Sequence, residues 1–219
     1  YAFSNLVRVS LEIPAEWRFP AMQTVEKAIG PSAVLLRNDT QADMHIAKDE
    51  NVPRDGFVLS VTDQGVMLRG SSRAGVYYGA QAFGQLLREA RAANEPLPAC
   101  QIQDSPDFPV RGVMLDISRD KVPTLATLFH LVDIFAHLRY NQLQLYMEHT
   151  FAYEQHAQVW LNASPLTPDD IRALDAYCRL HCIELVPNQN AFGHLERWLK
   201  YEEYLPLAEL PQGGAPLPW

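Results

Sequence analysis

The residues best suited to chemistry in this sequence stand in three short groups, each directly after an apolar run. They are Asp116 and Arg119, Glu148 and His149, and Asn190 and His194. Carboxylates accept hydrogen bonds from hydroxyl groups, whereas arginine and histidine side chains donate them. Such a set suits a neutral ligand that is rich in hydroxyl groups. The alternative is that Asp116 and Arg119 form an ion pair with each other, as neighbouring opposite charges commonly do.

Aromatic residues are concentrated around the second of these groups. They are Tyr146, Phe151, Tyr153 and Trp160. Flat aromatic rings can cover the apolar face of a sugar, while polar groups fix its orientation. The sequence therefore favours a carbohydrate ligand.

Other kinds of chemistry lack their characteristic spacing. Glu148, His149 and His156 do not have the helical HExxH arrangement of a zinc site, and no CxxC pair is present. There is no G-x-S-x-G nucleophile motif and no glycine-rich phosphate loop. We therefore expect neither a metal ion nor a cofactor.

The elements that position these groups alternate between strands and helices. Strands are predicted around residues 110–117, 141–147 and 183–186, and helices are predicted to begin at Thr124 and at Thr167. In the first strand, Val110 and Met114 are among the apolar residues expected to be buried, with both of its faces covered. This order is typical of the start of a β/α barrel, whose active site lies at the carboxyl ends of its strands. Three units cannot close an eight-stranded barrel, so we expect the remainder of the barrel from residues outside this chain.

The first 105 residues read as a smaller α+β domain. Strands are predicted at residues 6–13 and 33–36, a helix around residues 22–29, and a hairpin at residues 57–70 followed by a helix that Ser71 or Ser72 caps. Four prolines between Asn94 and Pro109 mark a boundary. The predicted division is therefore an accessory domain, residues 1–105, and the beginning of the barrel, residues 106–219.

Composition excludes several partners. The 219 residues carry a net charge of -8 without a basic patch, so nucleic acid and anionic membranes are not expected to bind. No apolar run is long enough to span a bilayer.

The three cysteines, Cys100, Cys178 and Cys182, are an odd number, and Cys178 and Cys182 are expected to be core residues. Together with the absence of a visible signal peptide, they favour a cytoplasmic protein.

Three segments resemble glycoside hydrolase family 20. Residues 55–89, DGFVLSVTDQGVMLRGSSRAGVYYGAQAFGQLLRE, are similar to the α/β accessory domain that precedes the catalytic barrel in that family. Residues 105–123, SPDFPVRGVMLDISRDKVP, resemble the entry into its first barrel strand. Residues 183–194, IELVPNQNAFGH, resemble its third strand and the glycine-histidine turn that follows.

The resemblance implies a retaining β-N-acetylhexosaminidase that removes terminal N-acetylglucosamine or N-acetylgalactosamine from a glycan. In that family the acetamido oxygen of the substrate is the nucleophile. Arg111 is matched to an arginine that binds sugar hydroxyls, and Asp116 and His194 to positions on the pocket floor. Glu148 and His149 complete the expected substrate-binding residues.

The sequence departs from the family pattern in three places. Asp120 stands where the family often has a histidine after the Ser-Arg of the first strand end. The second strand of this chain ends in Glu148-His149 rather than in a tryptophan-histidine run with paired aspartates. The family's Asp-Glu pair, which includes the general acid, follows a fourth strand, so no catalytic residue is expected within this chain. Two alternatives stay open: a non-catalytic carbohydrate-binding fragment, and a related glycosidase that shares the accessory domain.

Overall fold

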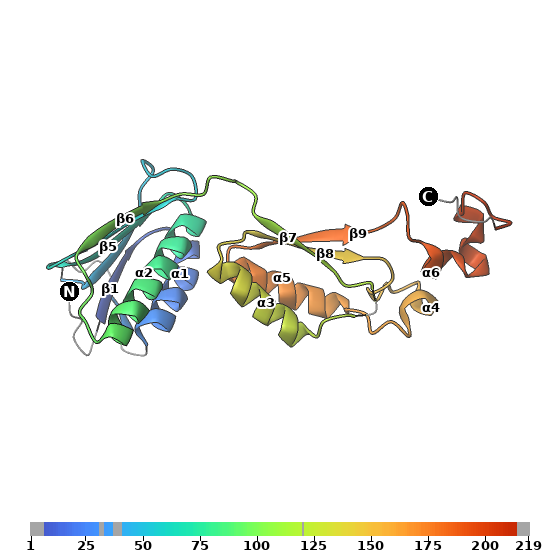
Figure 1. The fold of residues 1–219 in the computed structure, drawn as a ribbon, viewed down its shortest axis with the longest axis horizontal. Helices are drawn as coiled ribbons and strands as arrows, with labels where there is room; N and C mark the ends of the chain where they lie inside the picture. Colours follow the sequence, from blue (N-terminus) through green and yellow to red (C-terminus); the bar gives the residue numbers. More distant parts are fainter. Residues whose placement is uncertain (1–6, 31–32, 37–40, 120, 214–219) are drawn as a thin grey trace. The chain divides into compact units, whose positions relative to one another are not determined.

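The computed structural model describes residues 7–30, 33–36, 41–119 and 121–213. The chain divides into two compact units: residues 1–110 with 180–182, and residues 111–179 with 183–219 (Figure 1). Each unit pairs a β-sheet with helices. The predicted α/β class is confirmed.

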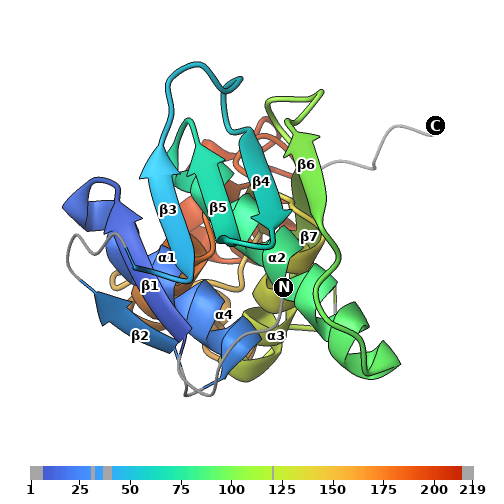
Figure 2. The same ribbon diagram turned by 90° about the vertical axis from the view of Figure 1, so that its left-hand side faces the viewer.

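The first unit contains a six-stranded mixed sheet with the order β2-β1-β3-β5-β4-β6. Its strands are β1 (Val7–Glu12), β2 (Ala33–Leu36), β3 (Met44–Lys48), β4 (Phe57–Thr62), β5 (Gly65–Gly70) and β6 (Cys100–Asp104). Its helices are α1 (Ala15–Ile29) and α2 (Arg73–Ala93). Both helices lie behind the sheet in Figure 2. The core therefore lies between one face of the sheet and these two helices.

Helix α2 lies close to the β4–β5 hairpin because its contacting face carries small residues. A Cβ atom at Gly75 would lie 2.2 Å from the carbonyl oxygen of Gly56, and one at Gly79 would lie 2.3 Å from a methyl group of Leu68. The helix begins as predicted, because the Ser72 hydroxyl accepts a hydrogen bond from the Gly75 amide at 3.1 Å. The predicted hairpin is also confirmed.

Two strands and part of one helix of this unit escaped the sequence analysis. Strand β6 lies inside the proline-rich boundary and pairs antiparallel with β4. Strand β3 is five residues long and too short to show a clear alternation. Helix α1 begins at Ala15, earlier than predicted, and contains Pro20 in its interior. A proline removes one backbone donor, and the helix continues past it here because its other residues still pack on the sheet.

The second unit contains a parallel sheet with the order β7-β8-β9. The strands are β7 (Gly112–Asp116), β8 (Gln142–Met147) and β9 (Glu184–Gln189). The helices are α3 (Leu125–His137), α4 (Ala157–Trp160), α5 (Pro168–Leu180), α6 (Glu196–Leu199) and the 3-10 helix η1 (Glu202–Leu207). Helices α3 and α5 run side by side along one face of this sheet (Figure 1).

The core of this unit lies between the central strand β8 and the two long helices. Alternate residues of β8 are buried, namely Leu143, Leu145 and Met147. Helix α3 buries Leu128, Val132 and Ala136, which are spaced four residues apart on a single stripe. The predicted caps are confirmed: Thr124 accepts from the Thr127 amide, and Thr167 from the Asp170 amide.

The expectation that both faces of the first barrel strand are buried is wrong for this sheet. Met114 is 60% exposed and Val110 is 61% exposed. Among the described residues, helices cover only one face of the sheet, and β7 lies at its edge. The open face is partly polar, because the Asn188 amide donates a hydrogen bond to Gln144 at 2.8 Å.

Cys178 is a core residue, as expected. It is fully buried in α5, and burial, assisted by the nearby Asp175 carboxylate, raises the pKa of its thiol to about 12. Since only the thiolate reacts with disulfide reagents, we expect roughly one thiol in ten thousand to be reactive at pH 8. In the folded protein, Cys178 should stay unlabelled by 5,5'-dithiobis(2-nitrobenzoate), and mass spectrometry should locate label there only after unfolding in guanidinium chloride. Rapid labelling of the native protein at Cys178 would contradict this burial.

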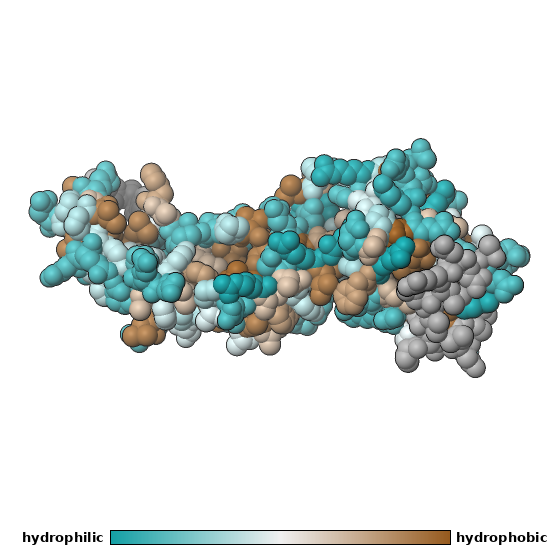
Figure 3. Space-filling model, turned by 180° about the vertical axis from the view of Figure 1, so that it is seen from behind, coloured by the Kyte–Doolittle hydropathy of each residue, from teal (hydrophilic) through white to brown (hydrophobic). Residues whose placement is uncertain are grey.

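On the face seen in Figure 3, hydrophobic residues appear in small groups among hydrophilic ones. Among the described helices, none combines the length and the apolar character that crossing a bilayer requires.

Candidate functional site

The carboxyl ends of β7 and β8 carry the charged residues of the second unit. Because the two strands are parallel, with Asp116 opposite Tyr146, their carboxyl ends meet at one edge of the sheet. Ser118, two residues after Asp116, connects the two ends: its hydroxyl accepts a hydrogen bond from the Glu148 amide at 2.7 Å. The Ser118 amide in turn donates to Asp116 at 2.9 Å. Thus the loops that follow the two strands are tied together.

Arg119 bridges two carboxylates at this edge. One of its terminal nitrogens donates to Asp116, and the other lies 3.0 Å from Glu148 Oε1. Its guanidinium group also lies over the Tyr146 ring, 5.5 Å from the ring centroid. The hydrogen bond to Asp116 is the largest of the causes that raise the pKa of Arg119 above its ordinary value. The group therefore stays positively charged at any physiological pH.

Glu148 is buried, with 7% of its surface exposed, and both its carboxylate and its backbone carbonyl oxygen accept hydrogen bonds. The Tyr146 hydroxyl donates to Glu148 Oε1 at 2.8 Å and accepts from the Asn190 amide at 2.6 Å. The Glu148 carbonyl oxygen accepts from Gln189 at 3.0 Å and from the Trp198 indole at 2.6 Å. Contacts from three strand ends thus fix the carboxylate in one position, where it can accept further hydrogen bonds.

We expect Tyr146→Phe to weaken this arrangement. The substitution removes the hydroxyl between Glu148 and Asn190 and keeps the ring. Two lost hydrogen bonds should lower the free energy of unfolding by about 1–2 kcal/mol, measured by urea denaturation. Tyr140→Phe is the matched control, since Tyr140 packs edge-on against Phe135 and its hydroxyl bonds to no described residue. Equal losses in both variants would mean that the Tyr146 hydroxyl has no special role.

A cavity of about 410 Å³ opens beside the charged residues. Arg119 and Glu148 line it on one side, and the segment from His194 to Arg197 lines it on the other. His194 has a positive φ of 53°, which turns the chain sharply between β9 and α6. The structure therefore brings Glu148 and His194 to one cavity, and Asp116 to the edge of that cavity through Arg119.

His149 and Arg111 lie elsewhere. His149 lines a neighbouring cavity of about 490 Å³. Arg111 precedes β7 and is roughly 16 Å from Asp116 along the strand, given a rise of about 3.3 Å per residue. Its guanidinium donates to the Arg139 carbonyl oxygen at 2.8 Å, at the turn between α3 and β8. The structure thus does not bring Arg111 to the other predicted residues, and Arg119 is the arginine at the carboxyl end.

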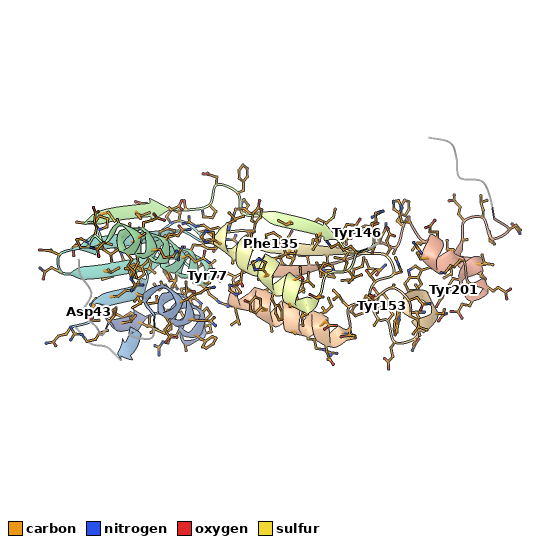
Figure 4. All side chains as sticks on the ribbon, turned by 60° about the horizontal axis from the view of Figure 1, so that its bottom comes forward. Asp43, Tyr77, Phe135, Tyr146, Tyr153 and Tyr201 are labelled. Carbon is orange, nitrogen blue, oxygen red and sulfur yellow. The ribbon has the colours of Figure 1, made fainter. Side chains whose placement is uncertain are left out.

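The aromatic residues expected around the site pack mainly on one another. Phe151 and Tyr153 meet edge to face with ring centroids 4.7 Å apart, and Trp160 donates to the Tyr153 carbonyl oxygen at 2.8 Å. The Tyr153 hydroxyl donates to Gln189 at 2.8 Å. Figure 4 shows Tyr146 and Tyr153 toward the carboxyl end of the sheet. These rings shape the loops around the cavity.

The arrangement combines a fixed cation with carboxylates, and this set can donate to and accept from hydroxyl groups. Among the described residues, no group of three or more histidine, cysteine, aspartate and glutamate side chains could hold a metal ion. Sequence reasoning did not identify Ser118 or Trp198 as parts of the site. The position of Ser118, two residues after Asp116 at the end of a predicted strand, could have indicated that it belongs to the site. Nothing in the sequence indicated Trp198, because it contacts Glu148 only through the tertiary fold.

Comparisons with known proteins relate this geometry to a family. The family model described as glycosyl hydrolase family 20, domain 2, matches residues 7–105. The model of the glycosyl hydrolase family 20 catalytic domain matches residues 108–209, which include the whole charged edge. The chain belongs to glycosyl hydrolase family 20. The charged edge and its cavity are therefore part of a family 20 catalytic domain.

The curated proteins to which this chain is similar include several named as beta-hexosaminidases. The chain is 28% identical over 198 residues to a beta-hexosaminidase of Akkermansia muciniphila, covering 80% of this chain and 40% of that protein. It is 25% identical over 197 residues to the beta-hexosaminidase subunit beta of Mus musculus, covering 86% of this chain and 35% of that protein. The chain spans less than half the length of these family 20 relatives.

Solved structures of the family have the same fold. A mutant Streptomyces plicatus beta-hexosaminidase in complex with its product GlcNAc superposes with a TM-score of 0.79 at 19% identity, over 93% of this chain and 45% of that one. The GH20 beta-N-acetylhexosaminidase of Streptomyces coelicolor also gives 0.79, at 20% identity, over 93% of this chain and 46% of that one.

Proposed function

We propose that this chain forms the accessory domain and the sugar-binding edge of a β-N-acetylhexosaminidase. The enzyme would remove terminal β-linked N-acetylglucosamine or N-acetylgalactosamine from glycans. The observation that carries the proposal is that residues 108–209, matched by the family's catalytic domain, include a fixed Asp116–Arg119–Glu148 array beside a cavity. In this proposal β7, β8 and β9 are the first three strands of a β/α barrel, which residues outside this chain would complete.

Each residue of the edge has a role in the proposal. Arg119 would donate hydrogen bonds to sugar hydroxyls, because its fork of donors is held in place by two carboxylates. Glu148 would accept from a hydroxyl with the part of its carboxylate that Tyr146 and Arg119 leave open. His194, exposed at the cavity mouth, would contact the sugar from the opposite side.

The proposed reaction uses the substrate as its own nucleophile. The acetamido oxygen attacks the anomeric carbon while the glycosidic bond breaks, and a general acid protonates the leaving oxygen. Water then opens the cyclic intermediate, so two inversions give net retention. We propose that the general-acid glutamate lies outside this chain, which leaves sugar binding and orientation to the residues described above.

The test is hydrolysis of nitrophenyl glycosides by the full-length protein, which would include the general acid; the 219-residue chain by itself is expected to be inactive. Nitrophenyl N-acetyl-β-glucosaminide should be cleaved at least about 100-fold faster, in kcat/KM, than nitrophenyl β-glucoside, which lacks the acetamido nucleophile. Early NMR spectra should contain the β-anomer of the released sugar. Equal rates on both substrates, initial release of the α-anomer, or cleavage of a glucuronide instead would each refute the proposal.

A further inference from the structure

The second cavity of this edge has a distinctive charge. It measures about 490 Å³, and loops that follow β7, β8 and β9 line it. Three of its lining residues are cationic, namely Lys121, Arg197 and Lys200. Among its described lining residues, none carries a carboxylate. In a chain with a net charge of -8, this local excess of positive charge runs against the average.

Within the part of the chain that the structure describes, carboxylates neutralise these cations only weakly. Among the ion pairs of the described residues, none involves Lys121 or Lys200. Arg197 lies 3.9 Å from Glu196, a long contact to a carboxylate that is itself 84% exposed. The Lys200 ammonium group lies 4.9 Å from the centroid of the Tyr201 ring, which also lines the cavity and is labelled in Figure 4. The positive charge is therefore available to a ligand.

Neutral hydrogen-bond donors accompany the cations. Ser164, with its hydroxyl group, and Asn162, with its amide, belong to the same lining. Cations together with hydroxyl and amide donors are the groups that oxyanions prefer in proteins. A neutral sugar would gain little from the positive charge of the lysines, whereas an anion would gain charge-assisted hydrogen bonds.

The cavity adjoins the one beside Arg119 and Glu148. Ser118 and Arg197 line both, and His149, which lines the second, directly follows Glu148. A glycan whose terminal sugar occupies the first cavity can therefore extend a substituent into the second.

We propose that the second cavity binds an anionic substituent, a carboxylate or a sulfate, of the glycan on which the enzyme acts. This inference rests on the proposed function and narrows its substrate class. Lys121 and Lys200 supply the charge, and Asn162 and Ser164 donate hydrogen bonds. Exposed ion pairs contribute modestly, so each lysine should account for roughly a two- to fivefold effect on kcat/KM.

The experiment compares three substrates at low salt. They are nitrophenyl N-acetyl-β-glucosaminide, its 6-sulfate, and a disaccharide of N-acetylglucosamine β-linked to glucuronic acid. The double variant Lys121→Met/Lys200→Met removes two charges and keeps much of the side-chain volume. Lys48→Met is the matched control, since Lys48 lies in the first unit and pairs with Glu50 at 2.7 Å.

At least one anionic substrate should be preferred by about fivefold or more, and the double variant should lose this preference while keeping the neutral activity. Salt at 0.5 M should abolish the preference as well. The sulfate and the glucuronate distinguish the two sources of negative charge. An unchanged substrate ratio in the double variant, or no preference in the unsubstituted protein, would overturn the inference while the hexosaminidase activity stands.

If no substrate is cleaved, the proposed function fails, and calorimetric binding then decides the inference by itself. A 6-sulfated N-acetylglucosamine and the glucuronate disaccharide serve as probes. Binding that weakens in the double variant but not in Lys48→Met would support the anionic cavity. Absence of binding, or equal binding by all variants, would overturn it.

Discussion

In the full-length protein, Arg119→Ala is expected to lower kcat/KM for nitrophenyl N-acetyl-β-glucosaminide by about 100- to 1000-fold. Arg119 is the one arginine that two carboxylates hold beside the 410 Å³ cavity in the described part of the chain, and each charged hydrogen bond to a sugar hydroxyl contributes about 1.5–3 kcal/mol. Steady-state hydrolysis measures the effect. Arg119→Lys keeps the positive charge but loses the planar fork of donors, so its kcat/KM should lie between those of the unsubstituted protein and Arg119→Ala. It also serves as a control for folding.

Arg111→Ala is the matched control at the opposite end of the same strand. Its guanidinium donates to the Arg139 carbonyl oxygen, so the variant should lose about 1 kcal/mol of unfolding free energy and change kcat/KM by less than twofold. If Arg111→Ala abolished activity while Arg119→Ala retained it, the sugar site would not lie at the carboxyl edge.

Leu145→Ala is expected to destabilise the second unit by about 2–5 kcal/mol. Leu145 is 1% exposed at the centre of β8 and packs toward the helix-covered face of the sheet, so the substitution leaves a cavity that its neighbours cannot fill. Urea denaturation followed by tryptophan fluorescence measures the change. Leu161→Ala is the control, because Leu161 is 66% exposed and should change stability by less than about 0.5 kcal/mol.

A small effect of Leu145→Ala, similar to that of Leu161→Ala, would mean that β8 does not anchor the core. Because Glu148 follows Met147 directly on this strand, a loosened β8 would also displace the charged edge. We therefore expect the activity of Leu145→Ala to fall at temperatures where part of the protein unfolds.

Local sequence signals predicted the elements of the second unit well. Thr167 before Pro168, with Asp170 three residues later, is a helix start that depends on nearby backbone groups alone, and the structure contains it. The strand that ends in Asp116 was equally readable from its apolar run. Such elements can be predicted because the hydrogen bonds and apolar runs that define them involve only residues close together in the sequence.

The incorrect predictions concern burial and strand pairing, which depend on contacts with residues distant in the sequence. Met114 is apolar, so its residue type predicted burial, but no described element covers its face of β7. Strand β6 lies within the proline-rich boundary, where no strand was predicted, and it pairs antiparallel with β4. Sequence patterns do not carry such information about which neighbours are present.

The charged edge was predicted in outline, and one residue of the predicted set, Arg111, lies away from it. Asp116, Glu148 and His194 come to one edge because the carboxyl ends of parallel strands meet there. Arg111 was matched to an arginine of the sugar site because it begins the same strand, yet it precedes Arg119 by eight positions and the two lie at opposite ends of β7. Spacing along a strand, rather than residue type, distinguishes them.

The most direct test of the sugar site is a titration of the purified protein with N-acetylglucosamine, followed by backbone amide NMR. We predict chemical-shift changes at Ser118, Arg119, Glu148 and residues 193–197, with none at Gly112, which lies at the amino end of the sheet. Changes at Gly112 without changes at Arg119 and Glu148, or no changes in a protein that hydrolyses the aryl N-acetyl-β-glucosaminide, would contradict a sugar site at the carboxyl edge.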